Sequence, residues 1–190
     1  MSSIYQLKVT LLGIKKPPIW RRILVKSDQL LSYLHKIIQT SMGWTNSHLH
    51  QFVKGRQYFS PPDPDGWMDT VDYSKMTIAR LLQKKGDKMV YEYDFGDGWE
   101  HVVLLEAILQ PEAGKTYPHC IKGKNACPPE DCGGIWGYQE LKEIMANPKH
   151  EQYKRMSNWL GKKTWDATKF DLDKVNQKLA KKDFGVRSWF

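Results

Sequence analysis

The segment MVYEYDFGDGWEHVVLLEAIL, residues 89–109, decides the fold prediction. Two stretches rich in aromatic, β-branched and aliphatic residues flank Gly96-Asp97-Gly98, which is typical of two antiparallel strands joined by a tight turn. A two-residue Asp-Gly turn would set Asp94 opposite His101, whereas a three-residue turn would set Asp94 opposite Glu100. The segment therefore predicts a hairpin with acidic residues and a histidine close to its tip.

The sequence on either side extends this sheet and adds helices. Alternating apolar residues predict further strands over 4–14, 19–26 and 48–54, the first two forming a hairpin. Helical spacing predicts helices from Ser27, as N-cap, to Gly43, and over 77–84, 137–146, 150–160 and 171–182. Residues 111–136 show no periodicity.

This order predicts one α+β domain over residues 1–190. Strands fill the first two-thirds and helices the C-terminal third, which favours a largely antiparallel sheet covered by helices. The β-β-α-β start is compatible with a β-grasp-like arrangement.

Length and composition exclude several classes of protein. The chain has 190 residues, of which 41% are hydrophobic and 26% charged, so it can bury a core and does not resemble a disordered, collagen-like or coiled-coil sequence. Its apolar runs are far shorter than the roughly 20 residues of a membrane span. No signal-like segment begins the sequence, so we expect a cytoplasmic protein with three reduced cysteines and no membrane partner.

The net charge of +8 is unevenly distributed. Residues 1–60 hold nine Lys and Arg and one acid, residues 61–110 hold five bases and ten acids, and residues 111–190 hold fifteen bases and ten acids. A basic protein of this kind can bind nucleic acid, or its charge can simply keep it soluble. The basic N-terminal third and the acidic middle each contain a candidate site.

The candidate nucleic-acid site lies in the first basic stretch. It comprises Lys15, Lys16, Arg21 and Arg22 for phosphate contact and Trp20 for stacking on a base. The alternative is a hairpin turn in which the arginine side chains lie over the tryptophan.

The second candidate site joins the hairpin to a cysteine-rich loop. Its acid cluster consists of Asp94, Glu100, His101, Glu130 and Asp131. Cys120, Cys127 and Cys132, with His101, could bind a divalent metal such as zinc, although their spacing is not that of paired CxxC motifs. Reduced cysteines in the core are the alternative. His48 and His50 form a further pair that could bind metal or make local hydrogen bonds.

Several of these motifs together resemble the plasmid pRiA ORF-three-like family, over nearly the whole chain. The matching stretches are Pro18–Arg22, Met42–Trp44, His48–His50, Tyr91–His101, Ala126–Gly134 and Phe170–Leu172. Members of that family are uncharacterised, and some are passenger proteins of insertion sequences. The resemblance implies a single α+β domain and no particular reaction. Its link with mobile elements favours a role related to nucleic acid, by association only.

We therefore expect a cytoplasmic binding or accessory module, linked to mobile elements, that contacts nucleic acid through its basic N-terminal region. The alternative is a metal-binding protein or metal-dependent hydrolase with its site at the Asp-Gly hairpin and the Cys-rich loop. The sequence does not decide whether the protein is an enzyme, nor its oligomeric state.

Overall fold

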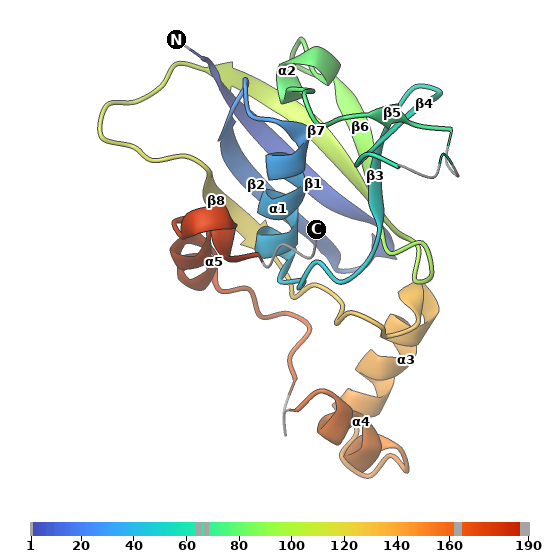
Figure 1. Ribbon diagram of the computed structural model, residues 1–190. Coiled ribbons are helices and arrows are strands. Elements are labelled where there is room, and N and C mark those ends of the chain that lie inside the picture. Colours follow the sequence, from blue (N-terminus) through green and yellow to red (C-terminus); the bar gives the residue numbers. More distant parts are fainter. Residues whose placement is uncertain (1, 64–65, 67–68, 162–164, 187–190) are drawn as a thin grey trace.

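An eight-stranded sheet forms the centre of the molecule (Figure 1). The computed structural model describes residues 2–63, 66, 69–161 and 165–186. The strand order is β5-β4-β3-β6-β7-β1-β2-β8. Every neighbouring pair with a described register is antiparallel except β4 and β5. The strands are β1 (Ile4–Lys15), β2 (Pro18–Lys26), β3 (His50–Lys54), β4 (Gln57–Ser60), β5 (Val71–Asp72), β6 (Lys88–Tyr93), β7 (Trp99–Leu109) and β8 (His119–Lys124).

The helices cover one face of the sheet and extend past one end of it. They are α1 (Leu31–Met42), α2 (Ile78–Leu81), α3 (Gly134–Ala146), α4 (Tyr153–Trp159) and α5 (Leu172–Leu179), followed by a 3₁₀ turn over Lys182–Gly185. In Figure 1, α1 lies across the sheet, α5 lies beside β8, and α3 and α4 project below the strands. The predicted α+β class and helical C-terminal region are therefore confirmed. No helix in the described part of the chain is both long enough and apolar enough to cross a membrane.

The β6–β7 hairpin is present, but neither predicted register is correct. Tyr93 pairs with Trp99, and Tyr91 pairs with His101, which leaves a five-residue loop from Asp94 to Gly98. The strand ends early because the Asp94 backbone turns away from it. Its N–H donates to Leu49 O at 2.9 Å, and its φ of 57° is left-handed. Asp94 therefore lies opposite neither His101 nor Glu100.

Helix α1 begins later than its sequence predicts. Ser27 is not its N-cap, because the Ser27 N–H donates to Ser3 O at 2.8 Å and its carbonyl accepts from Ala79 N at 3.0 Å. The helix starts at Leu31 instead and ends, as predicted, at Gly43, whose φ of 100° suits a residue without a side chain.

Strand β8 lies inside the region that sequence periodicity leaves irregular. It pairs with β2 at the edge of the sheet. Only Cys120 of this strand is buried, while Ile121, Lys122 and Lys124 are exposed. An edge strand with one inward side chain has no alternating apolar pattern to detect.

The core lies between α1 and the sheet. Four residues of α1, namely Leu31, Leu34, Ile37 and Ile38, are fully buried. They belong to the same apolar cluster as buried residues of the central strands, among them Leu7, Val9, Phe52, Tyr91, Val103 and Leu105. The predicted β-β-α-β start is present as β1, β2, α1 and β3, and β6 and β7 fill the sheet between β1 and β3.

Candidate metal centre

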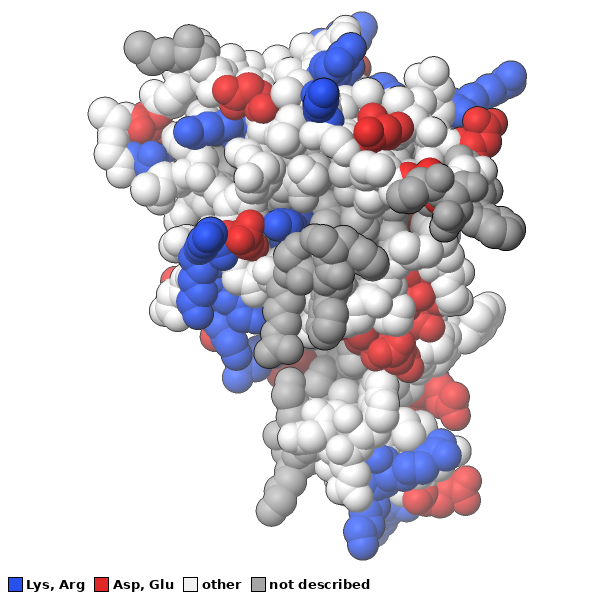
Figure 2. Space-filling model, in the orientation of Figure 1, with Lys and Arg blue, Asp and Glu red and all other residues white. Residues whose placement is uncertain are grey.

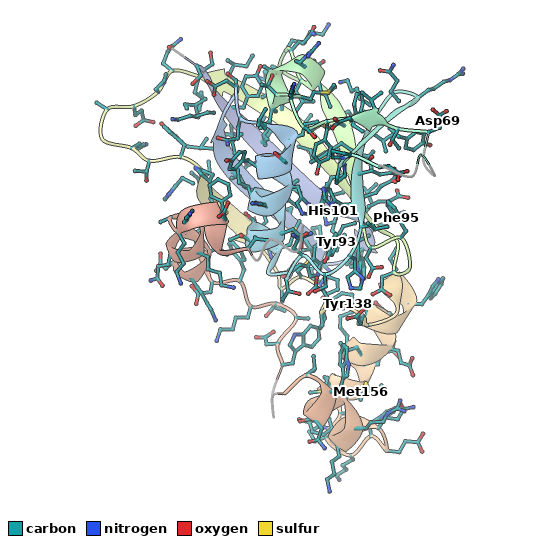
Figure 3. The ribbon with its side chains drawn as sticks, viewed as in Figure 1. Asp69, Tyr93, Phe95, His101, Tyr138 and Met156 are labelled. Atoms are coloured by element: carbon teal, nitrogen blue, oxygen red, sulfur yellow. The ribbon has the colours of Figure 1, made fainter. Side chains whose placement is uncertain are left out.

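Three segments that are distant in the sequence meet at one end of the sheet. They are the residues before β3, the loop between β6 and β7, and the loop of residues 125–133 between β8 and α3, called here the Cys loop. In Figure 3, Tyr93, Phe95 and Tyr138 mark this junction. Each segment supplies one residue of a cluster, His48, Asp94 and Asp131, whose ligand atoms all lie within 4.8 Å of one another. We call this set the His48–Asp94–Asp131 cluster.

The imidazole of His48 lies between the two carboxylates. Its Nε2 atom is 3.2 Å from Asp131 Oδ1 and 3.7 Å from Asp94 Oδ2. Neither contact has the geometry of a hydrogen bond, and Nε2 is buried with no hydrogen-bond partner. A buried polar atom of this kind normally has a partner, so its environment requires an explanation.

Local backbone structure holds Asp94 in place. Its Oδ1 atom accepts hydrogen bonds from Gly96 N at 3.1 Å and Asp97 N at 3.2 Å. These bonds leave Oδ2 to face His48. Asp94 is 7% exposed, whereas Asp131 is exposed on the Cys loop. The cluster therefore has a buried side and an open side.

Glu130 ties the three segments together. Its Oε2 accepts from the backbone N–H of Thr45 at 3.0 Å and from the Thr45 hydroxyl, and its Oε1 accepts from the Tyr93 hydroxyl. The same hydroxyl accepts from Ser47 N at 3.0 Å. Burial, and then the bond to Glu130, raise the pKa of Tyr93 far above its usual value, so this phenol remains a donor. Glu130, which directly precedes Asp131, is therefore bonded to Tyr93, which precedes Asp94, and through Tyr93 to Ser47, which precedes His48.

The cysteines and His101 do not join this cluster. Within the described residues, His48, Asp94 and Asp131 are the one group of three or more His, Cys, Asp or Glu with the geometry for a metal ion. Burial raises the pKa of all three thiols, that of Cys132 to about 12, so they are protonated near neutral pH. The predicted ligand set of Cys120, Cys127, Cys132 and His101 is thus not assembled.

His101 belongs to the core instead. Its ring lies edge-on to Trp44, with centroids 5.2 Å apart, and its Nδ1 is 3.2 Å from Tyr91 O. Burial lowers its pKa to about 3, so the imidazole is neutral. Glu100, the preceding residue, is exposed because neighbouring strand residues point to opposite faces. Of the predicted acid cluster, Asp94, Glu130 and Asp131 come together, and Glu100 and His101 do not.

His48 is the cluster residue that sequence reasoning places least well. In the sequence, its spacing of two residues from His50 is the feature that points to it. In the structure, the two histidines have different surroundings. His50 begins β3 and stacks on His35, with ring centroids 3.4 Å apart, while its Nε2 bonds the Tyr73 hydroxyl. His48 precedes the strand and is free to face the loops.

The residues of the predicted nucleic-acid site lie on different surfaces. Trp20 and Arg22 share one face of β2, where Arg22 forms an ion pair with Glu106. Arg21 points to the opposite face and is 1% exposed, so it is not placed to contact a nucleic-acid backbone. Lys15 and Lys16 are exposed at the β1–β2 turn. The predicted phosphate contact by Arg21 is therefore wrong, because successive strand residues alternate between faces and Arg21 points inward. Nucleic-acid contact by Lys15, Lys16, Trp20 and Arg22 stays a prediction.

Comparison with known proteins agrees with the resemblance seen in the sequence. The model of the family described as plasmid pRiA4b ORF-3-like protein matches residues 3–174. The chain belongs to this family. The plasmid pRiA4b ORF-3-like chain is 37% identical over 178 residues to the uncharacterised protein y4hQ of Sinorhizobium fredii, covering 93% of this chain and 91% of that protein.

A solved structure supports the fold of this family member. The crystal structure of the protein of unknown function MM3350 from Methanosarcina mazei Go1 aligns with a TM-score of 0.82 and 35% sequence identity. The alignment covers 91% of this chain and 97% of the archaeal one. The solved relative therefore has the fold described above over most of its length.

Proposed function

We propose that the protein binds a divalent metal ion at the His48–Asp94–Asp131 cluster. The observation that carries the proposal is the buried Nε2 of His48, which has no hydrogen bond although a carboxylate lies on either side. A cation among the three groups would give the imidazole a partner and offset the repulsion between the carboxylates.

The donor set indicates which metals would suit the cluster. One imidazole and two carboxylates favour zinc or manganese over a soft metal ion that prefers thiolate ligands, such as Cu(I). Three protein ligands are also the number found in catalytic zinc sites, which keep a position for water or substrate. A bound ion would lower the pKa of that water, so metal-dependent hydrolysis is the reaction class that this arrangement could support.

The network around Glu130 is consistent with an outer shell for such a site. Metal ligands are commonly oriented by hydrogen-bonded neighbours that do not themselves touch the ion. Here Glu130 fixes Thr45 and Tyr93, and Tyr93 fixes Ser47, the residue next to His48. The exposed position of Asp131 leaves an entry path for the ion.

The proposal is tested by titrating Zn²⁺ and Mn²⁺ into protein stripped with EDTA. Calorimetry and equilibrium dialysis should show one site per chain. His48→Gln and Asp131→Asn should each weaken binding more than about tenfold, because each removes a ligand. His119→Gln, which alters an exposed imidazole on β8, is the matched control and should bind as the wild type does. An unchanged affinity in His48→Gln, or no stoichiometric binding by the wild type, would overturn the proposal.

A further inference from the structure

We infer that a cavity next to the cluster binds a small ligand in which an anionic group is joined to a planar ring, the chemistry of a nucleoside monophosphate. This inference goes beyond metal binding and does not require it. It rests on the cavity's charge, aromatic lining and size.

The cavity lies between α5 and the Cys loop. Its volume is about 700 Å³, within the range of small-molecule sites. Glu130 and Asp131 line one part of it, so it adjoins the His48–Asp94–Asp131 cluster. Arg21, Phe170 and Lys174 line another part.

Arg21 contributes a buried positive charge to this cavity. Its Nε donates to Ser41 O at 2.7 Å, and its Nη1 donates to Trp20 O and Lys124 O, both at 2.9 Å. The Phe170 ring lies 4.0 Å from the guanidinium carbon. Among the described residues, no carboxylate lies within ion-pair distance of Arg21.

This arrangement solvates the guanidinium without neutralising it. Carbonyl oxygens and an aromatic face stabilise a cation, but they carry no net negative charge. In a buried site the remaining field is screened much less than at the surface. An anion entering the cavity would therefore be attracted to its Arg21 side.

Lysines from the neighbouring segment add to this positive field. Lys169, Lys174 and Lys178 all line the cavity, and Figure 2 shows basic side chains gathered over α5. Two of the carboxylates that line the cavity already accept hydrogen bonds from neighbouring residues. Glu130 is held by Thr45 and Tyr93, and Asp171 caps α5 by accepting from Lys174 N at 2.9 Å.

Aromatic side chains supply surfaces on which a planar ring could stack. Trp159, Trp165 and Phe170 line the cavity, and Trp159 is 46% exposed. Stacking of bases on aromatic rings beside positive charge is how proteins bind single-stranded nucleic acid without reading its sequence, and one nucleotide offers the same ring and phosphate. The volume suits one nucleotide rather than a strand, which favours a small ligand over a nucleic acid.

The test measures binding of AMP, adenosine and inorganic phosphate to the full chain in EDTA, at one fixed low ionic strength. Calorimetry and quenching of tryptophan fluorescence are the readouts, since tryptophans line the cavity. AMP should bind more tightly than either fragment. Lys174→Gln/Lys178→Gln should raise the Kd of AMP about tenfold or more, since it removes two charge-assisted contacts.

Lys181→Gln is the matched control, because Lys181 is exposed just after α5 and does not line the cavity. It should leave the Kd of AMP unchanged. The lysine variants alter exposed residues, so they keep the test independent of folding defects that Arg21 variants would introduce.

Failure of AMP to bind at millimolar concentration, or the same Kd in the double variant, would overturn the inference. A ten-nucleotide single strand that binds at least tenfold more tightly than AMP would also overturn it.

A His48→Gln protein separates this inference from the proposed metal site. It should lose metal affinity and keep its AMP affinity in EDTA. Loss of AMP binding in this variant without metal would contradict the independence of the two sites.

Discussion

Glu130 joins three parts of the molecule through one carboxylate. Glu130→Gln keeps the size of the side chain, but its amide nitrogen must face a donor from either Thr45 or Tyr93. We expect the free energy of unfolding to fall by about 1–3 kcal/mol. Metal affinity should fall about 10–100-fold without being abolished, because Glu130 positions ligands and is not one. Urea denaturation and metal titration measure the two effects.

Glu143→Gln is a suitable control for this substitution. Glu143 is exposed on α3, and its side chain has no described contact with the cluster. Its unfolding free energy and metal affinity should match those of the wild type. A Glu130→Gln protein with wild-type metal affinity would show that Glu130 has a purely structural role.

At the scale of elements, one asparagine completes the hydrogen bonding of an edge strand. Asn176 of α5 accepts from Cys120 N at 2.8 Å and donates to Cys120 O at 2.9 Å. Asn176→Ala should lower the free energy of unfolding by about 1–3 kcal/mol, because it leaves both backbone groups of Cys120 without these partners. Asn176→Asp should cost more, since a carboxylate oxygen would face the Cys120 carbonyl.

Urea denaturation and hydrogen exchange at the Cys120 amide measure this effect. Gln177→Ala, a change at the adjacent exposed position of the same helix, should leave both unchanged. If the Cys120 amide exchanged at the same rate in Asn176→Ala and in the wild type, α5 would not be held to β8 by this contact.

The elements that the sequence predicts well are those whose pattern is local. The β6–β7 hairpin and the C-terminus of α1 at Gly43 follow from alternation and from a glycine's freedom. The five-residue hairpin loop depends on a bond between Asp94 and Leu49, 45 positions away along the chain. Tertiary contacts of this kind leave no periodic signal, so the register of the tip was not predictable from the segment alone.

In the candidate site too, local sequence features could be predicted and tertiary contacts could not. Sequence reasoning identifies Asp94, Glu130 and Asp131, because turn-forming and loop residues there are chemically distinctive. It groups His101 with them incorrectly, because the error in register moves that side chain from the core to the hairpin tip. It also treats His48 and His50 as one pair. The start of β3 at His50 separates them, so that His48 faces the loops and His50 faces the core.

At the scale of the whole molecule, basic and acidic side chains gather over different parts of the face seen in Figure 2. Figure 2 shows basic side chains over α5 and acidic side chains where the hairpin tip approaches α3. In the basic N-terminal third, Arg21 is buried and Arg22 is paired with Glu106, so neither presents a free positive charge at the surface. The net charge of +8 is therefore a poor guide to where an anion would bind.

The core contains three neutral histidines, which should make the fold sensitive to acid. Burial lowers the pKa of His35 to about 4, of His101 to about 3, and of His50 well below its usual value. The unfolded chain titrates these groups near pH 6.5, so below that pH it binds more protons than the folded chain and stability falls as pH falls. Each histidine should remove about 1.4 kcal/mol per pH unit between pH 6.5 and its folded pKa.

Urea midpoints measured in EDTA should be nearly constant above pH 7 and fall steeply from pH 6 to pH 4. His101→Asn, whose amide can still donate to Tyr91 O, should reduce this slope by about one histidine's share. His119→Asn, at an exposed position, should not change it. Equal slopes in His101→Asn and the wild type would show that His101 is not held neutral by the core.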